Sequence, residues 1–570
     1  MKNAGTDERS TEAHRCHPER SEGPLRPQER SLAALGMTAG PDRASVIPGT
    51  RRAFLRAASA VTAALSLPRD VIADGAPRNA ADGLALNERT AKDLVALLQA
   101  RKVSSVELVD RAIARIEALD GKLNAVVVRD FERARSAAAA ADRALARGER
   151  RPLLGVPMTV KESFNVAGLP TTFGVPGTER IAVREDAVAV ARLKAAGAVV
   201  LGKTNLPLML ADMQSYNAVY GTTNNPWDLG RTPGGSSGGA AAALAAGYVP
   251  LELGSDLGGS LRVPASFCGV FAHKPTPGIV PMRGHAPPGS PSLSVPVRVD
   301  LAVAGPMARS AADLALALDV LAGPDDADAI AYKLALPPPR HTDLRDFRVL
   351  VIDEHPLLPT AAAVRAALDR MADRLAGSGV KVARTSPLLP DLAVVGRTFT
   401  ELLMAFFGAS VPDDVYGLQR SAAAALPAAE RSLSAVSLRS SVMSHREWVQ
   451  ADRLRTGIVD QWRQLFAHWD VVLCPAMPTP AFAHDHREKN VRRISIDGAQ
   501  VPYGDQAMWN SLATLGGLPA TIMPIGLSDE GLPIGLQIIG PYLEDRTTIA
   551  FAELVERSFG GFVAQPVFKG

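Results

Sequence analysis

Apolar residues recur every three or four positions in several parts of the chain, a spacing typical of helices that bury one face. The pattern predicts helices over residues 90–99, 105–119 and 131–147. At the first of these, Thr90 and Asp93 have the spacing of a capping box, in which each side chain bonds the other residue's backbone N–H. The first part of the folded protein is therefore expected to be helical.

Short apolar runs predict buried strands farther along the chain. Runs at 154–160, 198–201 and 249–253 alternate with helical patterns at 186–196 and 240–246. Such alternation is typical of an α/β layer fold. Another β-α-β unit is predicted at 349–352, 361–376 and 380–383, with further strands at 471–473, 522–525 and 536–539.

Three stretches interrupt this alternation. Residues 331–345 are rich in proline and are interpreted as a surface linker, whereas residues 396–465 are mostly helical in pattern. Residues 483–500 are polar and are interpreted as a surface excursion. Three tryptophans near the end of the helical stretch are expected to pack between helices: Trp448, Trp462 and Trp469.

The N-terminal region has a different character from the rest. Residues 1–50 are polar, Arg-rich and without periodicity, and are interpreted as a disordered or mis-started extension, with Met37 as an alternative start. The pair Arg51-Arg52 then precedes an apolar run over 57–67, and residues 71–73 behind it offer a small-residue cleavage site. A twin arginine before a short apolar run is typical of a Tat-type signal peptide, here residues 51–73.

The apolar run of this signal is too short to cross a bilayer, which needs about 20 residues. We therefore expect no stable membrane insertion once the signal is removed, and export to the periplasm or the extracellular space. The alternative interpretation is a short amphipathic helix of the folded domain.

Composition excludes several classes of protein. The net charge is only +3, from 62 basic and 59 acidic residues, and no basic run is interleaved with aromatics. This argues against a nucleic-acid partner. The three cysteines, Cys16, Cys268 and Cys474, have no CxxC spacing. A disulfide framework or a structural zinc site is therefore not expected.

Two glycine-rich segments carry the candidate chemistry. The first runs from Thr232 to Gly239 around Ser236 and Ser237, and the second from Gly254 to Arg262 around Ser260. A helix and a strand between them can return the chain to the same sheet edge. The adjacent backbone N–H groups of the second segment can form a nest for negative charge. A phosphate loop would need a lysine directly after the glycines, and none stands there.

A nucleophilic serine needs a base, and neither segment contains a histidine. Lysine can replace histidine when burial lowers its pKa. Lys161 follows the predicted strand at 154–160, and a strand end inside a sheet is a place where a lysine loses water. A solvated surface charge is the alternative interpretation of this lysine.

The two segments, followed by Cys268-Gly269-Val270 and Lys274-Pro275-Thr276, resemble the signature of the amidase signature family. The stretch 155–162 resembles that family's lysine motif, and further matches lie at 202–205, 225–228, 305–309 and 531–537. The resemblance implies a large mixed β-sheet covered by helices on both faces. It also implies a single amidase domain over residues 85–568, with a helical insertion at about 396–465.

The resemblance also implies a mechanism and the roles of single residues. Ser260 would be the nucleophile, and Lys161 would be the general base. Ser236, which would follow a cis peptide bond, would be the serine that bridges them. The oxyanion hole would consist of the backbone N–H groups of Leu257, Gly258, Gly259 and Ser260. Ser237, Asp256 and Arg262 would have structural roles beside the site. No metal and no cofactor is implied.

Other reactive residues have simpler interpretations. His273 stands where the family usually has an aliphatic residue and is expected to pack in the core rather than contact substrate. The sequence His484-Asp485-His486 has no third metal ligand nearby, so solvated side chains are favoured over a metal site. Cys268 has no adjacent base and is expected to be a buried small residue.

The resulting hypothesis is an exported serine amidase that hydrolyses carboxamide C–N bonds through an acyl-Ser260 intermediate. Two alternatives stay open: the glutaminase subunit of a tRNA-dependent amidotransferase, and a non-catalytic ligand-binding relative. The partner is expected to be a small amide, and the sequence does not decide between a monomer and a homodimer. Substrate identity should depend on residues 205–220, 283–300 and 396–465.

Overall fold

A computed structural model describes residues 86–290 and 299–565. The extension (1–50) and the signal peptide (51–73) predicted from sequence lie outside the described residues. The strands are β1 (Val126–Arg129), β2 (Pro157–Lys161), β3 (Val199–Thr204), β4 (Tyr216–Asn217), β5 (Gly221–Thr222), β6 (Leu251–Asp256), β7 (Phe271–Lys274), β8 (Val303–Ala308), β9 (Arg348–Val351), β10 (Lys381–Ala383), β11 (Val471–Pro475), β12 (Arg493–Ile496), β13 (Ala499–Pro502), β14 (Ala520–Leu527) and β15 (Pro533–Ile539).

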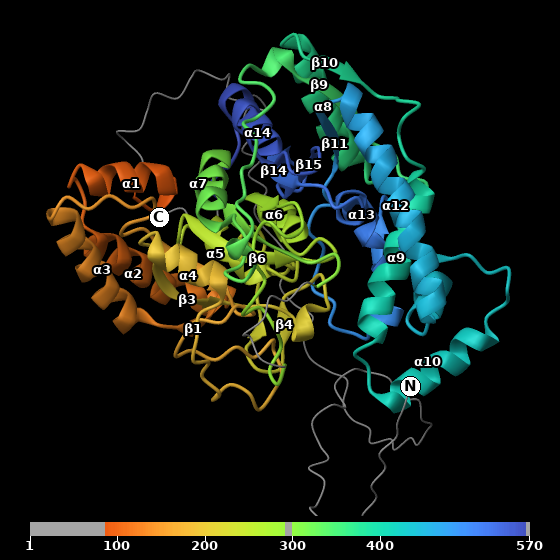
Figure 1. The fold of residues 1–570 in the computed structure, drawn as a ribbon, viewed down its shortest axis with the longest axis horizontal. Helices are drawn as coiled ribbons and strands as arrows, with labels where there is room; N and C mark the ends of the chain where they lie inside the picture. Colours follow the sequence, from red (N-terminus) through yellow and green to blue (C-terminus); the bar gives the residue numbers. More distant parts are fainter. Residues whose placement is uncertain (1–85, 291–298, 566–570) are drawn as a thin grey trace, which may run out of the picture. The chain divides into compact units, whose positions relative to one another are not determined.

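Helices flank these strands along most of the chain (Figure 1). They are α1 (Ala91–Gln99), α2 (Ser105–Leu123), α3 (Phe131–Ala146), α4 (Val188–Ala195), α5 (Gly238–Ala245), α6 (Arg262–Cys268), α7 (Ala311–Leu321), α8 (Ala362–Gly377), α9 (Leu392–Gly408), α10 (Asp413–Ala425), α11 (Leu433–Ser440), α12 (His445–His468), α13 (Met508–Leu515) and α14 (Asp545–Phe559).

One mixed sheet organises the described residues, and it contains eleven of their strands in the order β1-β3-β2-β6-β8-β7-β14-β15-β11-β9-β10. Strand β2 is parallel to both of its neighbours, β3 and β6. Strand β9 is likewise parallel to β10 and β11, whereas the strands between these two groups pair antiparallel. The predicted large mixed sheet is therefore confirmed.

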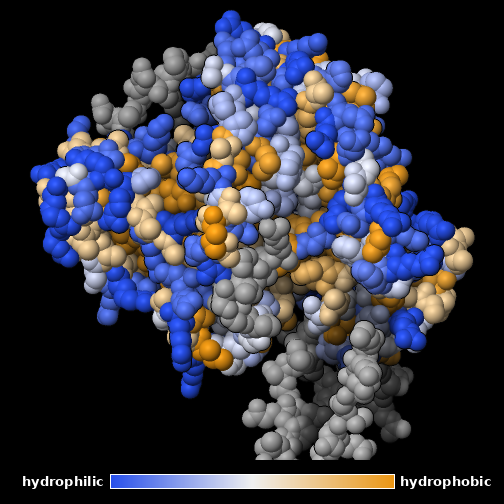
Figure 2. Space-filling model, viewed as in Figure 1, coloured by the Kyte–Doolittle hydropathy of each residue, from blue (hydrophilic) through white to orange (hydrophobic). Residues whose placement is uncertain are grey.

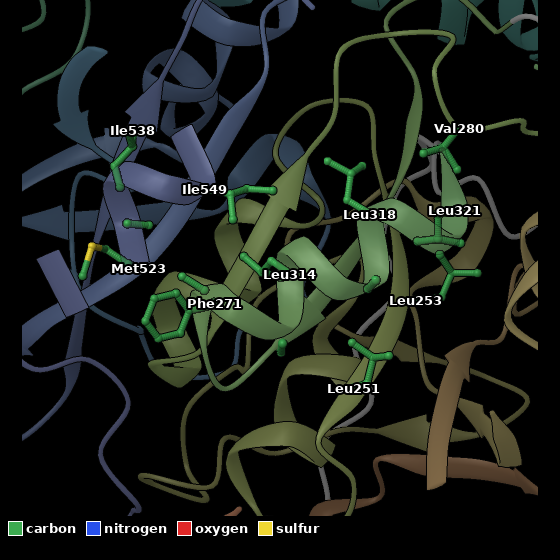
Figure 3. Packing of buried hydrophobic residues seen from close by; sticks show 14 of the residues in the cluster. Leu251, Leu253, Phe271, Val280, Leu314, Leu318, Leu321, Met523, Ile538 and Ile549 are labelled. Atoms are coloured by element: carbon green, nitrogen blue, oxygen red, sulfur yellow. The ribbon is translucent and has the colours of Figure 1, made fainter. Parts of the chain in front are cut away.

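Helices cover both faces of the sheet, because successive strand residues point to opposite sides. Val349 and Val351 of β9 belong to one buried cluster with residues of α7, α8 and α14, whereas Leu350 belongs to another with residues of α9, α12 and α13. Figure 3 shows the first cluster, in which Leu251 and Leu253 of β6 lie near α7. Each such fully buried aliphatic side chain contributes about 1.5–3 kcal/mol relative to exposure.

Several helix predictions are confirmed. Helix α1 begins after the N-cap Thr90, and both hydrogen bonds of the predicted capping box with Asp93 are present. Helices α2 and α3 match the predicted segments closely. The predicted β-α-β unit is present as β9-α8-β10, and its two strands pair in parallel.

Two predictions differ from the structure. The strand expected over 154–160 begins only at Pro157, because Gly155, at φ +85°, turns the chain just before it. The polar stretch 483–500 contains strand β12, which pairs with β13. Ile494 and Ile496 of β12 are buried at alternate positions, so this stretch is only partly a surface excursion.

Helices α9 to α12 occupy most of the stretch 392–468. That this stretch is an insertion into one domain spanning 85–568 stays a prediction. The tryptophan interpretation is confirmed, since Trp462 is fully buried and Trp448 and Trp469 pack against the same hydrophobic cluster.

Polar residues dominate much of the face in Figure 2, and hydrophobic residues appear there in separate groups. Large hydrophobic side chains with more than half of their surface exposed include Ile330, Tyr332 and Leu418. In the described part of the chain, no helix has the length and apolar character needed to cross a membrane.

Candidate active site

Lys161 is the last residue of β2, in the parallel part of the sheet, and its side chain is completely buried. Its Nζ lies 2.6 Å from Ser236 Oγ and 3.0 Å from Ser255 Oγ. The surface alternative for this lysine is therefore wrong. A buried amine in contact with two hydroxyls is well placed to exchange protons with them.

The two glycine-rich segments meet as the sequence predicts. Helix α5 starts two residues after Ser236, and β6 brings the chain back to Asp256, just before Ser260. The N–H of Ser237 donates to the Ser260 carbonyl at 3.2 Å, which joins the two segments directly. The Gly235–Ser236 peptide bond is cis, as the family resemblance implies. A Cβ at residue 235 would lie 2.6 Å from the Asp212 carbonyl oxygen, which explains the glycine.

Burial makes Lys161 a base rather than a fixed charge. Desolvation lowers its pKa from 10.5 to about 7, although the nearby carboxyl groups of Asp256 and Glu252 act in the opposite direction. Burial also raises the pKa of Glu252 to about 8, so this group is largely neutral near pH 7. A substantial fraction of Lys161 is therefore neutral at neutral pH.

In the turn from Leu257 to Ser260, every residue except the buried Gly259 is partly exposed. The N–H of Gly259 donates to Asp256 Oδ1 at 2.8 Å. Among the described residues, the N–H groups of Leu257, Gly258 and Ser260 have no protein acceptor, so they are the ones free for a ligand. Gly259 has φ +120°, and a Cβ there would lie 2.9 Å from Asn510 and Val263 side-chain atoms, so only glycine fits.

A buried ion pair holds this turn in place. Asp256 and Arg262 are both fully buried, with Arg262 Nη2 2.9 Å from Asp256 Oδ1. Asp256 also accepts from the N–H of Leu261 at 3.0 Å. Burial alone would raise the pKa of Asp256, but the Arg262 guanidinium lowers it to about 2. The remaining guanidinium hydrogens reach Asn510, Thr514 and Gln537.

Two polar residues beside the lysine have no role in the sequence-based prediction. Ser255 Oγ contacts Lys161, and His285 Nε2 lies 3.0 Å from both Ser255 Oγ and Ser163 Oγ. Ser255 belongs to the second glycine-rich segment, so the sequence already indicated that it lies near the site. His285 comes from a loop after Pro281 that no local pattern connects to Lys161, and only the three-dimensional fold brings it there.

The other candidates lie outside this cluster. His273 is buried, with Nδ1 3.0 Å from Thr521 Oγ1 and Nε2 3.1 Å from Asp545 Oδ1, which confirms its interpretation as a packed core residue. Cys268 is buried and free, and burial raises the pKa of its thiol, so the small-residue interpretation is confirmed. His484 Nε2 contacts Asn224 at 3.1 Å, and His486 stacks on Tyr216.

Comparison with known proteins places this geometry in a family. Residues 107–549 match the family model described as Amidase. A glutamyl-tRNA(Gln) amidotransferase subunit of Psychrobacter cryohalolentis is 34% identical over 82% of this chain and 95% of its own length. The indoleacetamide hydrolase of Bradyrhizobium diazoefficiens is 34% identical over 82% of this chain and 86% of its own length.

Among solved structures, a bacterial aryl acylamidase of the amidase signature family superposes with a TM-score of 0.69. It is 26% identical, over 83% of this chain and 96% of its own. This chain thus belongs to the amidase signature family. Its activity is the hydrolysis of carboxamide C–N bonds, the chemistry that the family shares.

Proposed function

We propose that this protein is a serine amidase in which Lys161, Ser236 and Ser260 act in sequence on linear amides. The observation that carries the proposal is the buried Lys161 amine, 2.6 Å from Ser236 Oγ, with a pKa lowered to about 7. Neutral Lys161 accepts the proton of Ser236, and Ser236 accepts that of Ser260. The Ser260 oxygen then bonds to the amide carbonyl carbon.

The backbone turn supplies the electrostatic part of the mechanism. The unpaired N–H groups of Leu257, Gly258 and Ser260 stabilise the negative oxygen of the tetrahedral intermediate. When the C–N bond breaks, the proton returns through Ser236 to the leaving amine or ammonia. Water then hydrolyses the acyl ester on Ser260 by the same route. The chemistry of the proposed residues requires no metal and no cofactor.

Covalent labelling tests this assignment. Purified protein, without any partner, is expected to react with a fluorophosphonate probe at a single serine, and peptide mass spectrometry should locate the adduct on Ser260. Ser260→Ala should abolish labelling, and Ser237→Ala serves as the matched control, because Ser237 is a neighbouring buried serine outside the proposed relay. A label on another serine, or undiminished labelling of the Ser260 variant, would contradict the proposal.

The similarity to glutamyl-tRNA(Gln) amidotransferase subunits favours a second candidate, the glutaminase subunit of a tRNA-dependent amidotransferase. The two functions differ in their need for a partner. An amidase hydrolyses simple amides alone, whereas a glutaminase subunit is expected to act on glutamine and to depend on its complex. A turnover screen of the isolated protein against glutamine and a panel of aliphatic and aryl amides separates them.

We also propose that residues 51–73 direct export by the Tat route, supported by the Arg51-Arg52 pair and the apolar run behind it. Replacing both Arg51 and Arg52 with lysine is expected to leave the protein in the cytoplasm, because the export machinery reads the arginine pair itself. Cell fractionation measures the distribution. Arg56→Lys is the control and should be exported like the wild type, and equal export of the double-lysine variant would refute the signal.

A further inference from the structure

One titratable side chain at the site has no part in the proposed relay. The ring of His285 packs against the rings of Phe164 and Phe173, with ring centroids 4.6 and 5.5 Å away. Its Nε2 is 3.0 Å from Ser255 Oγ, Ser255 Oγ is 3.0 Å from Lys161 Nζ, and Lys161 Nζ is 2.6 Å from Ser236 Oγ. A continuous hydrogen-bonded chain therefore leads from the imidazole to the proposed bridging serine.

The direction of the hydrogen bonds along this chain decides whether Lys161 can act as a base. A neutral amine has two N–H donors and one lone pair, and the lone pair must face Ser236 to take its proton. The hydroxyl of Ser255 can either accept an N–H of Lys161 or donate its own proton to the lone pair. In the second arrangement Ser255 competes with Ser236, and the base is blocked.

The imidazole of His285 can determine the direction in which the Ser255 hydroxyl donates its proton. Among the described residues, the Ser255 hydroxyl proton has two possible acceptors, the Lys161 amine and His285 Nε2. Burial and the neighbouring Lys161 lower the pKa of His285 to about 3, so the ring is neutral and one of its nitrogens is an acceptor. With Nε2 as the acceptor, the Ser255 hydroxyl points to His285, and its oxygen is left to accept from Lys161.

We propose that His285 is a positioning residue that orients the Ser255 hydroxyl away from Lys161 and so keeps the amine lone pair directed at Ser236. The aromatic cage of Phe164 and Phe173 holds the ring in the required place. Ser163, the other hydroxyl at Nε2, has no contact with Lys161 in the structure. The inference rests on the proposed role of Lys161 as the base.

The test replaces the acceptor and keeps the shape. His285→Phe retains an aromatic ring for the cage and removes the nitrogen, and kcat is expected to fall at least tenfold with KM unchanged. His285→Gln places an amide oxygen near the position of Nε2 and should restore kcat to within about threefold of wild type. Ser163→Ala, the matched control at the same nitrogen, should also stay within about threefold. A purely structural role would not produce rescue by glutamine.

A double-mutant comparison isolates the path through Ser255. In a Ser255→Ala background no hydroxyl can block the amine, so adding His285→Phe is expected to cost no further activity. A full tenfold additional loss in that background, or wild-type kcat for His285→Phe alone, would overturn the inference. If the phenyl ring prevents folding, His285→Leu, which also lacks an acceptor, takes its place in the same comparison. Failure of wild-type labelling at Ser260 would instead reject the proposed function itself.

Discussion

Replacing Lys161 with methionine is expected to lower kcat by a factor on the order of 10⁴ or more, because among the described residues its amine is the base that contacts the Ser236 hydroxyl. Methionine has a similar length and no charge, so it fills the same buried space.

In the wild type, kcat/KM should fall about tenfold per pH unit below pH 7, as Lys161 becomes protonated. Steady-state rates on any amide that is turned over measure both effects.

The buried amine of Lys161 also makes the stability of the wild-type protein depend on pH. The pKa of Lys161 is about 7 in the folded protein and 10.5 as the ordinary value, so between these values the unfolded chain binds more protons. Wild-type stability therefore rises with pH across this window, and below pH 7 the full cost of burying the amine is present. Lys161→Met lacks this cost, and its stability relative to wild type should be most favourable at or below pH 7.

The control for the predicted loss of activity in Lys161→Met is Lys203→Met. Lys203 is a second fully buried lysine on the adjacent strand β3, and burial lowers its pKa to about 8. Its Nζ contacts Thr171 Oγ1 at 2.9 Å, and no hydroxyl of the proposed relay. Turnover per folded molecule is expected to stay within about tenfold of wild type. A Lys161→Met protein that keeps such turnover would show that another group activates Ser260.

Much of the fold was predictable because it depends on local patterns. Neighbouring residues alone indicate the capping box at Thr90 and the apolar periodicity of α2 and α3. They also indicate the alternation of strands and helices. The start of β2 was not predictable in this way, because Val156 is as apolar as a strand residue and only the left-handed turn at Gly155 ends the run. The hairpin β12–β13 was hidden because alternating Ile494 and Ile496 stand among charged neighbours.

The candidate site was likewise predictable from the sequence only in part. Lys161, Ser236 and Ser260 stand in motifs that the sequence displays, and a helix and a strand between the serines indicate that they meet. The environment of those residues was not predictable. His285 and three partners of Arg262, namely Asn510, Thr514 and Gln537, lie far away in the sequence, and only packing of the whole sheet brings them together. Which N–H groups of the turn are free likewise depends on the orientation of the Asp256 carboxylate.

Replacing Arg262 with methionine is expected to lower the free energy of unfolding by about 3–5 kcal/mol, because it leaves the buried Asp256 carboxylate without its counter-charge. The backbone N–H groups of Gly259 and Leu261 would be the main donors left to that carboxylate. Asn510, Thr514 and Gln537 would lose a guanidinium partner as well. Equilibrium unfolding in urea measures the change, provided the variant is still folded without denaturant.

Two comparisons show whether the uncompensated charge is the cause. Arg111→Met breaks a pair with Glu107 of similar length, 3.0 Å, on the surface, where it is worth about 0–1 kcal/mol. Asp256→Asn combined with Arg262→Met removes both charges and should be less destabilised than Arg262→Met alone. If the double variant is at least as unstable as the single one, lost packing and hydrogen bonds outweigh the buried charge. If Arg262→Met costs no more than Arg111→Met, the ion pair does not hold the turn, and the free N–H groups of Leu257, Gly258 and Ser260 owe their alignment to the glycine backbone instead.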